Sequence, residues 1–220
     1  MSEKITIALS KGKLLPPTLE IFRRAGFGLN PIADDDRRLV FESPADGLTL
    51  LLVRASDVPA YVEYGSADVG VVGKDVLLEQ APNVYEPVDL GIGTCKIAVA
   101  MLKGWSHPPR LSSKIRVATK YPRITERHFN QQGTPVEIIK LYGSIELAPI
   151  VGLAERIVDL VSSGRTLKAH HLVETEVIAW SSARLIVNRA SLKMKPTVIA
   201  HLIDQLRRNR PSARIEKGAL

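Results

Sequence analysis

The stretch DLVSSGRTL, residues 159–167, follows the apolar pair Ile157-Val158 and is the best starting point for working out the fold. The apolar residues predict a strand, and the small residues after it predict a loop that leads into a helix. Closely spaced hydroxyls and backbone N–H groups in such a loop are suited to bind a phosphate. Asp159, at the end of the predicted strand, could accept hydrogen bonds from the hydroxyls of a sugar attached to that phosphate. An ordinary serine-glycine turn is the alternative, because short motifs also occur by chance.

The length and composition of the chain indicate a folded protein with one large domain or two small lobes. It has 220 residues, of which 45% are hydrophobic. No apolar run approaches the roughly 20 residues that a membrane span needs, and the N-terminus does not resemble a signal peptide, so we expect a cytoplasmic protein with no membrane partner. The single cysteine, Cys95, excludes an internal disulfide and argues against a cysteine-based metal site.

The charge of the chain favours anionic partners. Lysine and arginine number 30 against 23 aspartate and glutamate residues, which gives a net charge of +7. Nucleotides, phosphosugars and nucleic acids would all fit that charge. Aromatic residues make up only 5% of the chain, and no basic stretch is interleaved with stacking rings, so we do not expect a nucleic-acid partner.

Basic residues follow several predicted strands in the first half of the chain. Ile5–Leu9 predicts a strand, and the loop after it contains Lys11, Gly12 and Lys13 before a helical pattern begins. Apolar strands are also predicted over 48–53 and within the stretch 67–75, and they lead into Arg54 and into the pair Gly73-Lys74. Open α/β sheets bind ligands at the carboxyl ends of their strands. These residues are therefore candidate contacts for an anion.

The charged segment 34–38 allows two interpretations. It contains three aspartates followed by Arg37 and Arg38, and it precedes an apolar run. A solvated loop explains this composition as well as a functional turn does. If the turn is functional, Arg37 or Arg38 would join the other cations at the site.

The second half of the chain repeats the pattern of strand, loop and helix. Strands are predicted over 116–119 and 136–141, with helices after Tyr121-Pro122, over 145–153 and over 196–209, whereas residues 82–87 are interpreted as a connection. Two βα lobes of this kind would bring their loops together at one cleft. The predicted fold class is therefore α/β with two lobes.

Several motifs taken together resemble those of the ATP phosphoribosyltransferase family in its short form. The resemblance covers nearly the whole chain. The motifs that carry it are ALSKGKL (8–14), DVP (57–59), YG (64–65), DVGVVG (68–73), VATKYP (117–122), GSIELAP (143–149), DLVSSGRTL (159–167) and SARL (182–185).

The resemblance implies two lobes like those of type II periplasmic binding proteins, with the active site in the cleft between them. We expect residues 1–95 and 183–220 to form lobe I and residues 96–182 to form lobe II, without the C-terminal histidine-binding domain of long family members. The implied reaction joins N1 of the adenine of ATP to phosphoribosyl pyrophosphate, which gives phosphoribosyl-ATP and pyrophosphate in the first step of histidine biosynthesis. The implied cofactor is Mg²⁺, held through the substrate phosphates rather than by side chains. The implied partner is a regulatory subunit similar to histidyl-tRNA synthetase, in a hetero-oligomer that contains a homodimer of this chain.

The resemblance also suggests a role for each candidate residue. The phosphoribosyl substrate would contact Asp159, Ser162, Ser163, Gly164, Arg165, Thr166 and Leu167, with Asp159 at the ribose hydroxyls. The nucleotide or pyrophosphate would contact Lys11, Gly12, Lys13, Gly73, Lys74 and Glu146, and the catalytic cations would be Arg54, Lys11 and Arg37. For Glu146, a carboxylate that caps a helix is the alternative.

One part of the sequence departs from the family pattern. Family members commonly continue the phosphate loop as Ala-Asn-Gly-Leu, whereas this chain has Ala169-His170-His171-Leu172, so we expect a local difference in the turn. We do not expect the two histidines to bind a metal, because neighbouring residues on a strand point to opposite faces.

Two other functions remain open from the sequence. A solute-binding module would share the two-lobed fold, and a nucleic-acid binder would share the basic charge.

Overall fold

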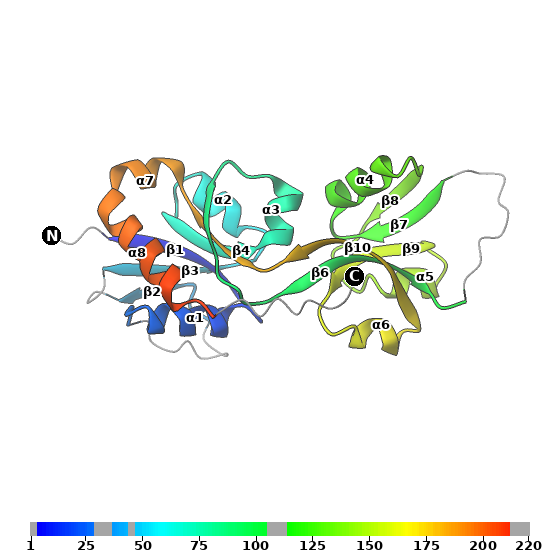
Figure 1. The fold of residues 1–220 in the computed structure, drawn as a ribbon, viewed down its shortest axis with the longest axis horizontal. Helices are drawn as coiled ribbons and strands as arrows, with labels where there is room; N and C mark the ends of the chain where they lie inside the picture. The colour runs from blue at the N-terminus through cyan, green and yellow to red at the C-terminus, as the bar shows by residue number, and fades with distance from the viewer. Residues whose placement is uncertain (1–3, 29–36, 44–46, 105–113, 212–220) are drawn as a thin grey trace. The chain divides into compact units, whose positions relative to one another are not determined.

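The computed structural model describes residues 4–28, 37–43, 47–104 and 114–211. The chain folds as two compact units: unit 1 consists of residues 1–93 and 182–220, and unit 2 consists of residues 94–181. Each unit is an α/β structure built on one sheet (Figure 1). None of the helices in the described ranges is long and apolar enough to cross a membrane.

Unit 1 contains a six-stranded sheet with the strand order β2-β3-β1-β4-β11-β5. The strands are β1 (Ile5–Ser10), β2 (Val40–Ser43), β3 (Leu48–Val53), β4 (Val69–Gly73), β5 (Tyr85–Asp89) and β11 (Ala183–Val187). β1 is parallel to β3 and β4, whereas β2 is antiparallel to β3, and β11 is antiparallel to β4 and β5. The carboxyl ends of β1, β3, β4 and β5 therefore lie at one edge of the sheet, together with the amino ends of β2 and β11.

Helices cover both faces of this sheet. They are α1 (Leu15–Arg24), α2 (Val58–Glu63), α3 (Lys74–Gln80), α7 (Arg189–Met194) and α8 (Pro196–Asn209). On one face, Ile7 and Leu9 of β1 belong to a core cluster with residues of α1 and α8. On the other face, Ala8 belongs to a cluster with residues of α2 and α3. Burial on both faces explains why the parallel strands are apolar at nearly every position.

Unit 2 contains a five-stranded sheet with the strand order β10-β6-β9-β7-β8. The strands are β6 (Cys95–Leu102), β7 (Ile115–Thr119), β8 (Val136–Lys140), β9 (Arg156–Val161) and β10 (Leu172–Ser181). β7 is parallel to β8 and β9, and β6 is antiparallel to β9 and β10. The helices are α4 (Pro122–Gln131), α5 (Leu147–Ile150) and α6 (Arg165–Ala169).

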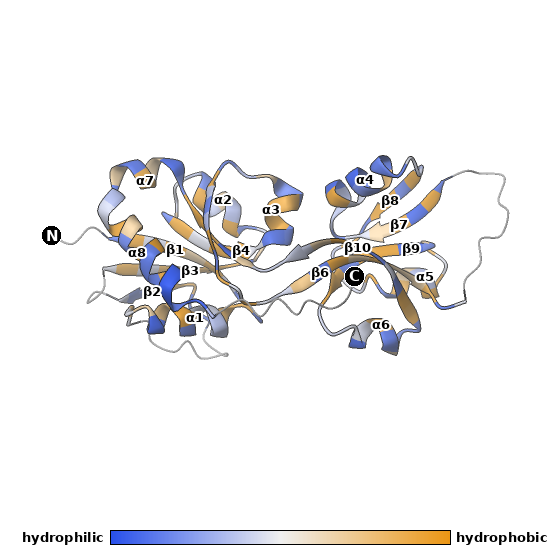
Figure 2. Cartoon of the chain, viewed as in Figure 1, coloured by the Kyte–Doolittle hydropathy of each residue, from blue (hydrophilic) through white to orange (hydrophobic). Residues whose placement is uncertain are grey.

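The helices of unit 2 also lie on opposite faces of their sheet. Residues from α5 and α6 share one core cluster, and α4 lies on the other side (Figure 1). The outer side of α4 is hydrophilic, whereas the strands of both sheets carry hydrophobic residues (Figure 2). Each loop that joins a strand to a helix is therefore held at both ends by an element with buried or partly buried side chains.

The segments that differ from the sequence-based expectation include residues 82–87, α5 and α7. Residues 82–87, interpreted as a connection, contain the start of β5. This strand is the last in the strand order and pairs with β11, and a proline such as Pro87 is tolerated in an edge strand. α5 is shorter than the helix expected over 145–153, because Ser144 and Gly152 are left-handed, with φ of 50° and 71°. α7 was not predicted; the side chain of Asn188 caps it by accepting hydrogen bonds from two backbone N–H groups.

Candidate active site

A basic residue lies next to each of four neighbouring strands at one edge of the sheet in unit 1. Arg54 directly follows β3, Lys11 follows β1, and Lys74 begins the helix after β4. Arg37 comes shortly before β2, and β2 runs antiparallel to β3, so Arg37 belongs to the same edge. The strand order therefore places these four residues along the edge in the sequence Arg37, Arg54, Lys11, Lys74. We call this set the cation row.

The local backbone explains how Lys11 and Arg54 come to be neighbours. Ser10 and Val53 are paired at the ends of β1 and β3, and the backbone N–H of Lys11 donates to the carbonyl oxygen of Val53 at 3.2 Å. The next residue, Gly12, has a φ of 95°, which a glycine adopts without strain, and this turns the chain into α1. The side chains of Lys11, Lys13 and Arg54 are exposed and available to a ligand.

Lys74 differs from the rest of the cation row because it already has a partner. Its Nζ lies 2.6 Å from Oε2 of Glu86 on β5. Its backbone N–H donates to the carbonyl oxygen of Ser182 at 2.9 Å, so this N–H is not available to a ligand. An anion at Lys74 would have to compete with Glu86. Nothing in the sequence indicated this ion pair, because Glu86 lies in a segment that was interpreted as a connection.

The predicted phosphate loop of unit 2 begins two residues later than expected. β9 continues to Val161, so Asp159 lies within the strand and not at its end. It is paired there with Ala98 of β6, and its Oδ1 accepts a hydrogen bond from the backbone N–H of Leu160 at 2.8 Å. The side chain of Asp159 is partly exposed, so a ligand can reach it.

The loop itself presents hydroxyl groups to solvent. Ser162, Ser163 and Thr166 are exposed, and Nε of Arg165 donates to Oγ of Ser163 at 3.2 Å. Gly164 has a φ of 69°, and a Cβ atom there would meet nothing within 4 Å, so the backbone conformation and not the available space is what favours a glycine.

Leu167 has a different role from the residues before it. Its side chain is only 7% exposed and belongs to the core cluster of unit 2. It therefore anchors the loop, and only its backbone could serve a ligand.

The exit from the loop contains the histidine pair. His171 has a φ of 56°, so it adopts the left-handed conformation in which glycine is unstrained. Its carbonyl oxygen accepts a hydrogen bond from the backbone N–H of Lys103 at 2.9 Å, which fixes the start of β10. Within the described ranges, no group of three or more His, Cys, Asp or Glu side chains is arranged to hold a metal.

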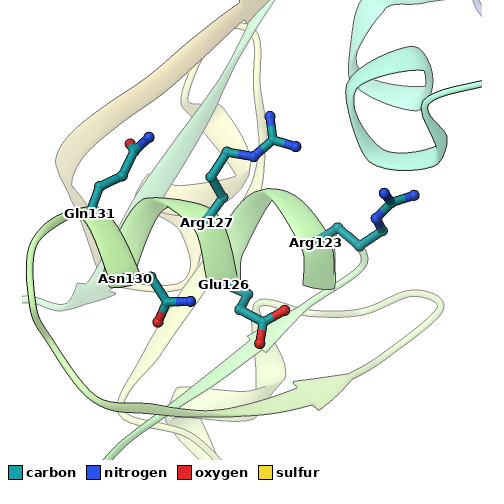
Figure 3. A pocket seen from close by; sticks show the side chains of 5 residues that line it. All are labelled: Arg123, Glu126, Arg127, Asn130 and Gln131. Carbon is teal, nitrogen blue, oxygen red and sulfur yellow. The ribbon is translucent and has the colours of Figure 1, made fainter.

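A pocket of about 500 Å³ lies on the outer side of α4 (Figure 3). It is lined by Arg123, Glu126, Arg127, Asn130 and Gln131, all from that one helix. None of them was a predicted site residue. All five are exposed, so the pocket is an open hollow on the surface of unit 2.

Comparison with known proteins shows to which class of enzyme this candidate site belongs. The model of the HisG family, described as ATP phosphoribosyltransferase, matches residues 54–208. A curated ATP phosphoribosyltransferase from Syntrophotalea carbinolica is 54% identical over 210 residues, which are 94% of this chain and 96% of the relative. The chain belongs to the ATP phosphoribosyltransferase family.

Two further comparisons extend this result. The ATP phosphoribosyltransferase of Geobacter metallireducens is 50% identical over 211 residues, which are 95% of this chain and 100% of the relative. A chain in the structure of the ATP phosphoribosyl transferase (HisG:HisZ) complex from Thermotoga maritima is 31% identical, covers 93% of this chain and 98% of its own length, and has a TM-score of 0.80. Membership of the family confirms the predicted class of enzyme, a pentosyltransferase.

Two candidate residues of this phosphoribosyltransferase were uncertain from the sequence. Glu146 occupies the N-cap position of α5, but its side chain makes no capping hydrogen bond, so the structure gives no support to the alternative of a capping carboxylate. Arg37 is exposed at the start of the described segment 37–43. The three aspartates before it lie in residues 34–36, outside the described residues.

Proposed function

We propose that this enzyme binds the phosphates of its two substrates with two different elements. The loop 162–166 of unit 2 would bind the 5′-phosphate of phosphoribosyl pyrophosphate, and Asp159 would accept hydrogen bonds from the ribose hydroxyls. The cation row of unit 1, with Lys13, would bind the pyrophosphate group and the phosphates of ATP. The observation that carries this assignment is the strand order, which brings one cation from each of four neighbouring strands to a single edge.

The chemistry of the reaction fits a site that is rich in cations and poor in nucleophiles. N1 of adenine forms a bond to the anomeric carbon, and the bond from that carbon to the pyrophosphate oxygen breaks. The barrier arises mainly from bringing two polyanions together and from the negative charge that collects on the leaving group. Fixed positive charges and N–H donors lower such a barrier, and one such donor is typically worth roughly 3 kcal/mol. Arg54, Lys11 and Arg37 would supply these charges.

Glu146 and the pair Gly73-Lys74 have weaker support as nucleotide contacts. Glu146 has no capping role, which leaves its carboxylate available to a polar group of the nucleotide. Lys74 would contribute only after a phosphate displaces Glu86.

Magnesium would enter with the substrates. The residues of the two candidate elements are lysines, arginines, serines, a glycine and a threonine, which are donors for anions. The two carboxylates assigned to the site, Asp159 and Glu146, are not part of any group of three or more possible metal ligands in the described ranges, so they do not form the oxygen cage that Mg²⁺ prefers. Mg²⁺ complexed by the substrate phosphates would reduce the repulsion between the two polyanions. The protein residues would then orient the complexed phosphates.

Both substrates must meet at one place, so we place the active site in a cleft between the two units, as in type II periplasmic binding proteins. The Thermotoga maritima neighbour was determined as a HisG:HisZ complex, which supports a regulatory subunit as partner of this chain in a hetero-oligomer. A homodimer of this chain within that hetero-oligomer is part of the proposal. A cytoplasmic location would suit an enzyme of amino-acid biosynthesis.

Pyrophosphate release tests the proposal. The chain is mixed with ATP, Mg²⁺ and phosphoribosyl pyrophosphate, with and without a HisZ-type regulatory subunit, and pyrophosphate is followed by a coupled assay. We expect turnover that requires both substrates. Binding of either substrate without turnover in both mixtures would instead support a solute-binding module.

A further inference from the structure

The chain crosses between the two units twice, and the two crossings lie side by side. They occur at 93–94 and at 181–182. In unit 2, Cys95 and Ser181 are paired at the ends of the antiparallel strands β6 and β10. In unit 1, β5 and β11 are antiparallel neighbours, and Asp89 is paired with Arg184. The connection between the two units is therefore confined to a few residues in each of two neighbouring segments, which we call the crossing segments.

The carboxylate of Asp89 connects the two crossing segments to each other. Its Oδ1 accepts hydrogen bonds from the backbone N–H of Gly91, at 2.9 Å, and from Oγ of Ser182, at 2.8 Å. Its Oδ2 lies 2.9 Å from Nη2 of Arg184. Gly91 leads to the first crossing, whereas Ser182 and Arg184 follow the second. One carboxylate with three donors thus holds both segments, and hydrogen bonds to an ionised group are stronger than those between neutral groups.

A series of ion pairs continues from Asp89 to the cation row. Nη1 of Arg184 lies 3.3 Å from Oε1 of Glu86, and Oε2 of Glu86 lies 2.6 Å from Nζ of Lys74. The four side chains are 24–37% exposed, so water reaches them only in part. A phosphate that takes Lys74 from Glu86 would leave Glu86 and Asp89 to share Arg184.

The lysine loop also contacts the first crossing. Gly93 is left-handed, with a φ of 64°, and a Cβ atom there would come within 2.3 Å of Cδ2 of Leu14. Leu14 is the residue after Lys13 in the loop that carries Lys11. The residue that follows the lysine loop thus packs directly against the backbone of a crossing segment.

We propose that Asp89 is a positioning residue for phosphoribosyl transfer. It holds the two crossing segments in one arrangement, and the ion pairs through Arg184 and Glu86 couple that arrangement to anion binding at Lys74. The coupling to Lys74 rests on the proposed function, whereas the role of Asp89 at the crossings rests only on its own hydrogen bonds. Asp89 does not touch the substrates.

Loss of this carboxylate would lower the fraction of molecules that are ready to bind substrates. The apparent KM rises by the inverse of that fraction, whereas turnover of the assembled complex is unaffected. For Asp89→Asn we expect KM values for both substrates to rise about fivefold, with kcat changed less than about twofold. A residue with a merely structural role would lower the amount of folded enzyme without this split between KM and kcat.

The spread of distances between the units measures the effect directly. Ketone-bearing amino acids at Ala200 on α8 and Asn130 on α4, both exposed, are spin-labelled, which leaves Cys95 unchanged. The labelled chain is diluted with unlabelled chain so that only distances within one chain are read by pulsed electron resonance. We expect a wider distance distribution for Asp89→Asn than for the parent. Asp204→Asn is the matched control, because Asp204 pairs with Arg208 on the exposed side of α8.

Three results decide the proposal. Equal distance distributions and equal KM values for Asp89→Asn and the parent would overturn it. Ser182→Ala, which removes one of the three donors, keeps the test possible if Asp89→Asn fails to fold, and it should widen the distribution less. Lys74→Met tests the coupling. The coupling would be supported if phosphoribosyl pyrophosphate or ATP changes the distance distribution of the parent but not that of Lys74→Met. Unchanged substrate affinity in Lys74→Met would refute the anion contact but leave the role of Asp89 intact.

Discussion

The two units differ in the residues that we propose for phosphate binding. In unit 1, exposed lysines and arginines follow the carboxyl ends of parallel strands, and charge is the main attraction. In unit 2, a short loop of serines, a glycine and a threonine offers neutral hydroxyls and backbone N–H groups, with one arginine. Charges act over about 10 Å at moderate salt, whereas hydroxyls act only on contact. Unit 1 would therefore attract and neutralise the polyanions, and unit 2 would select the sugar phosphate by shape.

The two units also differ in the contacts that hold their helices and strands together. In unit 1, Oδ2 of the buried Asp68 accepts hydrogen bonds from the backbone N–H of Thr6 at 2.9 Å and from Nζ of Lys195 at 2.8 Å, and its Oδ1 accepts one from Oγ of Ser191 at 2.7 Å. This ties β1 and β4 to α7 and the start of α8. In unit 2, an apolar anchor, Leu167, holds the loop.

Removal of a charge from the cation row should have the largest effect. For Lys11→Met we expect kcat/KM to fall about a hundredfold, because a fixed donor to the leaving group is worth about 3 kcal/mol. Steady-state kinetics with both substrates measures it. Lys193→Met is the control, because it removes the same charge from an exposed position of α7. This helix follows the carboxyl end of β11, which lies at the end of the sheet opposite to the cation row, so kcat/KM should be unchanged. Equal losses in both variants would mean that only overall charge matters.

Removal of the charge on Asp68 should give the next largest effect, on stability. Burial alone raises the pKa of Asp68, but the hydrogen bonds from Lys195, Thr6 and Ser191 and the charge of Lys195 outweigh it, so the pKa is lowered. We expect Asp68→Asn to cost about 2 kcal/mol at pH 7, because hydrogen bonds to a charged group are lost. Denaturant unfolding measures this cost.

The effect of Asp68 has a defined pH dependence. A lowered pKa in the folded state stabilises the protein fully above the unfolded value of about 3.9, and this contribution is lost as the pH falls through the folded pKa. The difference between the parent and Asp68→Asn should therefore shrink below about pH 4. A difference that grows on acidification would contradict the assignment. Asp204→Asn, in an exposed pair, should change stability by less than about 0.5 kcal/mol.

Loss of a hydroxyl in unit 2 should have a smaller and more selective effect. For Thr166→Ala we expect the KM for phosphoribosyl pyrophosphate to rise about tenfold, as one hydrogen bond to a charged group is lost, with the KM for ATP nearly unchanged. Thr197→Ala, at an exposed position of α8, is the control. Equal weakening of both substrates would count against the division of roles between the units. Gly164→Val should show the same selectivity, because valine is strained at a φ of 69°.

The histidine at the loop exit should give the smallest effect. His171→Gly should stabilise unit 2 by about 1 kcal/mol, because a left-handed conformation strains residues other than glycine. His170, with a φ of −106°, is the neighbouring control, and His170→Gly should not be stabilising. Thermal unfolding of the two variants compares them directly. A lower melting temperature for His171→Gly would show that the histidine side chain makes a compensating interaction.

Sequence patterns predicted the regular elements well where burial was uniform. α8 begins at Pro196 and ends at Asn209, as its apolar spacing predicted, and the apolar runs became β1, β3 and β4. β5 was missed, because an edge strand with a proline and exposed residues carries no clear pattern. α7 was missed because it is short and depends on the cap from Asn188. The sequence led us to expect a local difference at His170-His171, but only the backbone conformation showed what it is. His171 adopts a left-handed φ, which a histidine can do at a modest cost.

The sequence by itself determined the family, the class of reaction and the residue types that we propose for phosphate binding, because these depend on motifs whose members lie close together in the chain. Only the tertiary structure decided which residues stand next to one another. The strand order turns Arg37, Arg54, Lys11 and Lys74 into one row, and the pairing of β5 with β11 gives Lys74 a carboxylate partner and joins Asp89 to Ser182. The hydrogen bond between Ser182 and Asp89 links residues 93 positions apart, and local patterns carry no information about pairs at that separation.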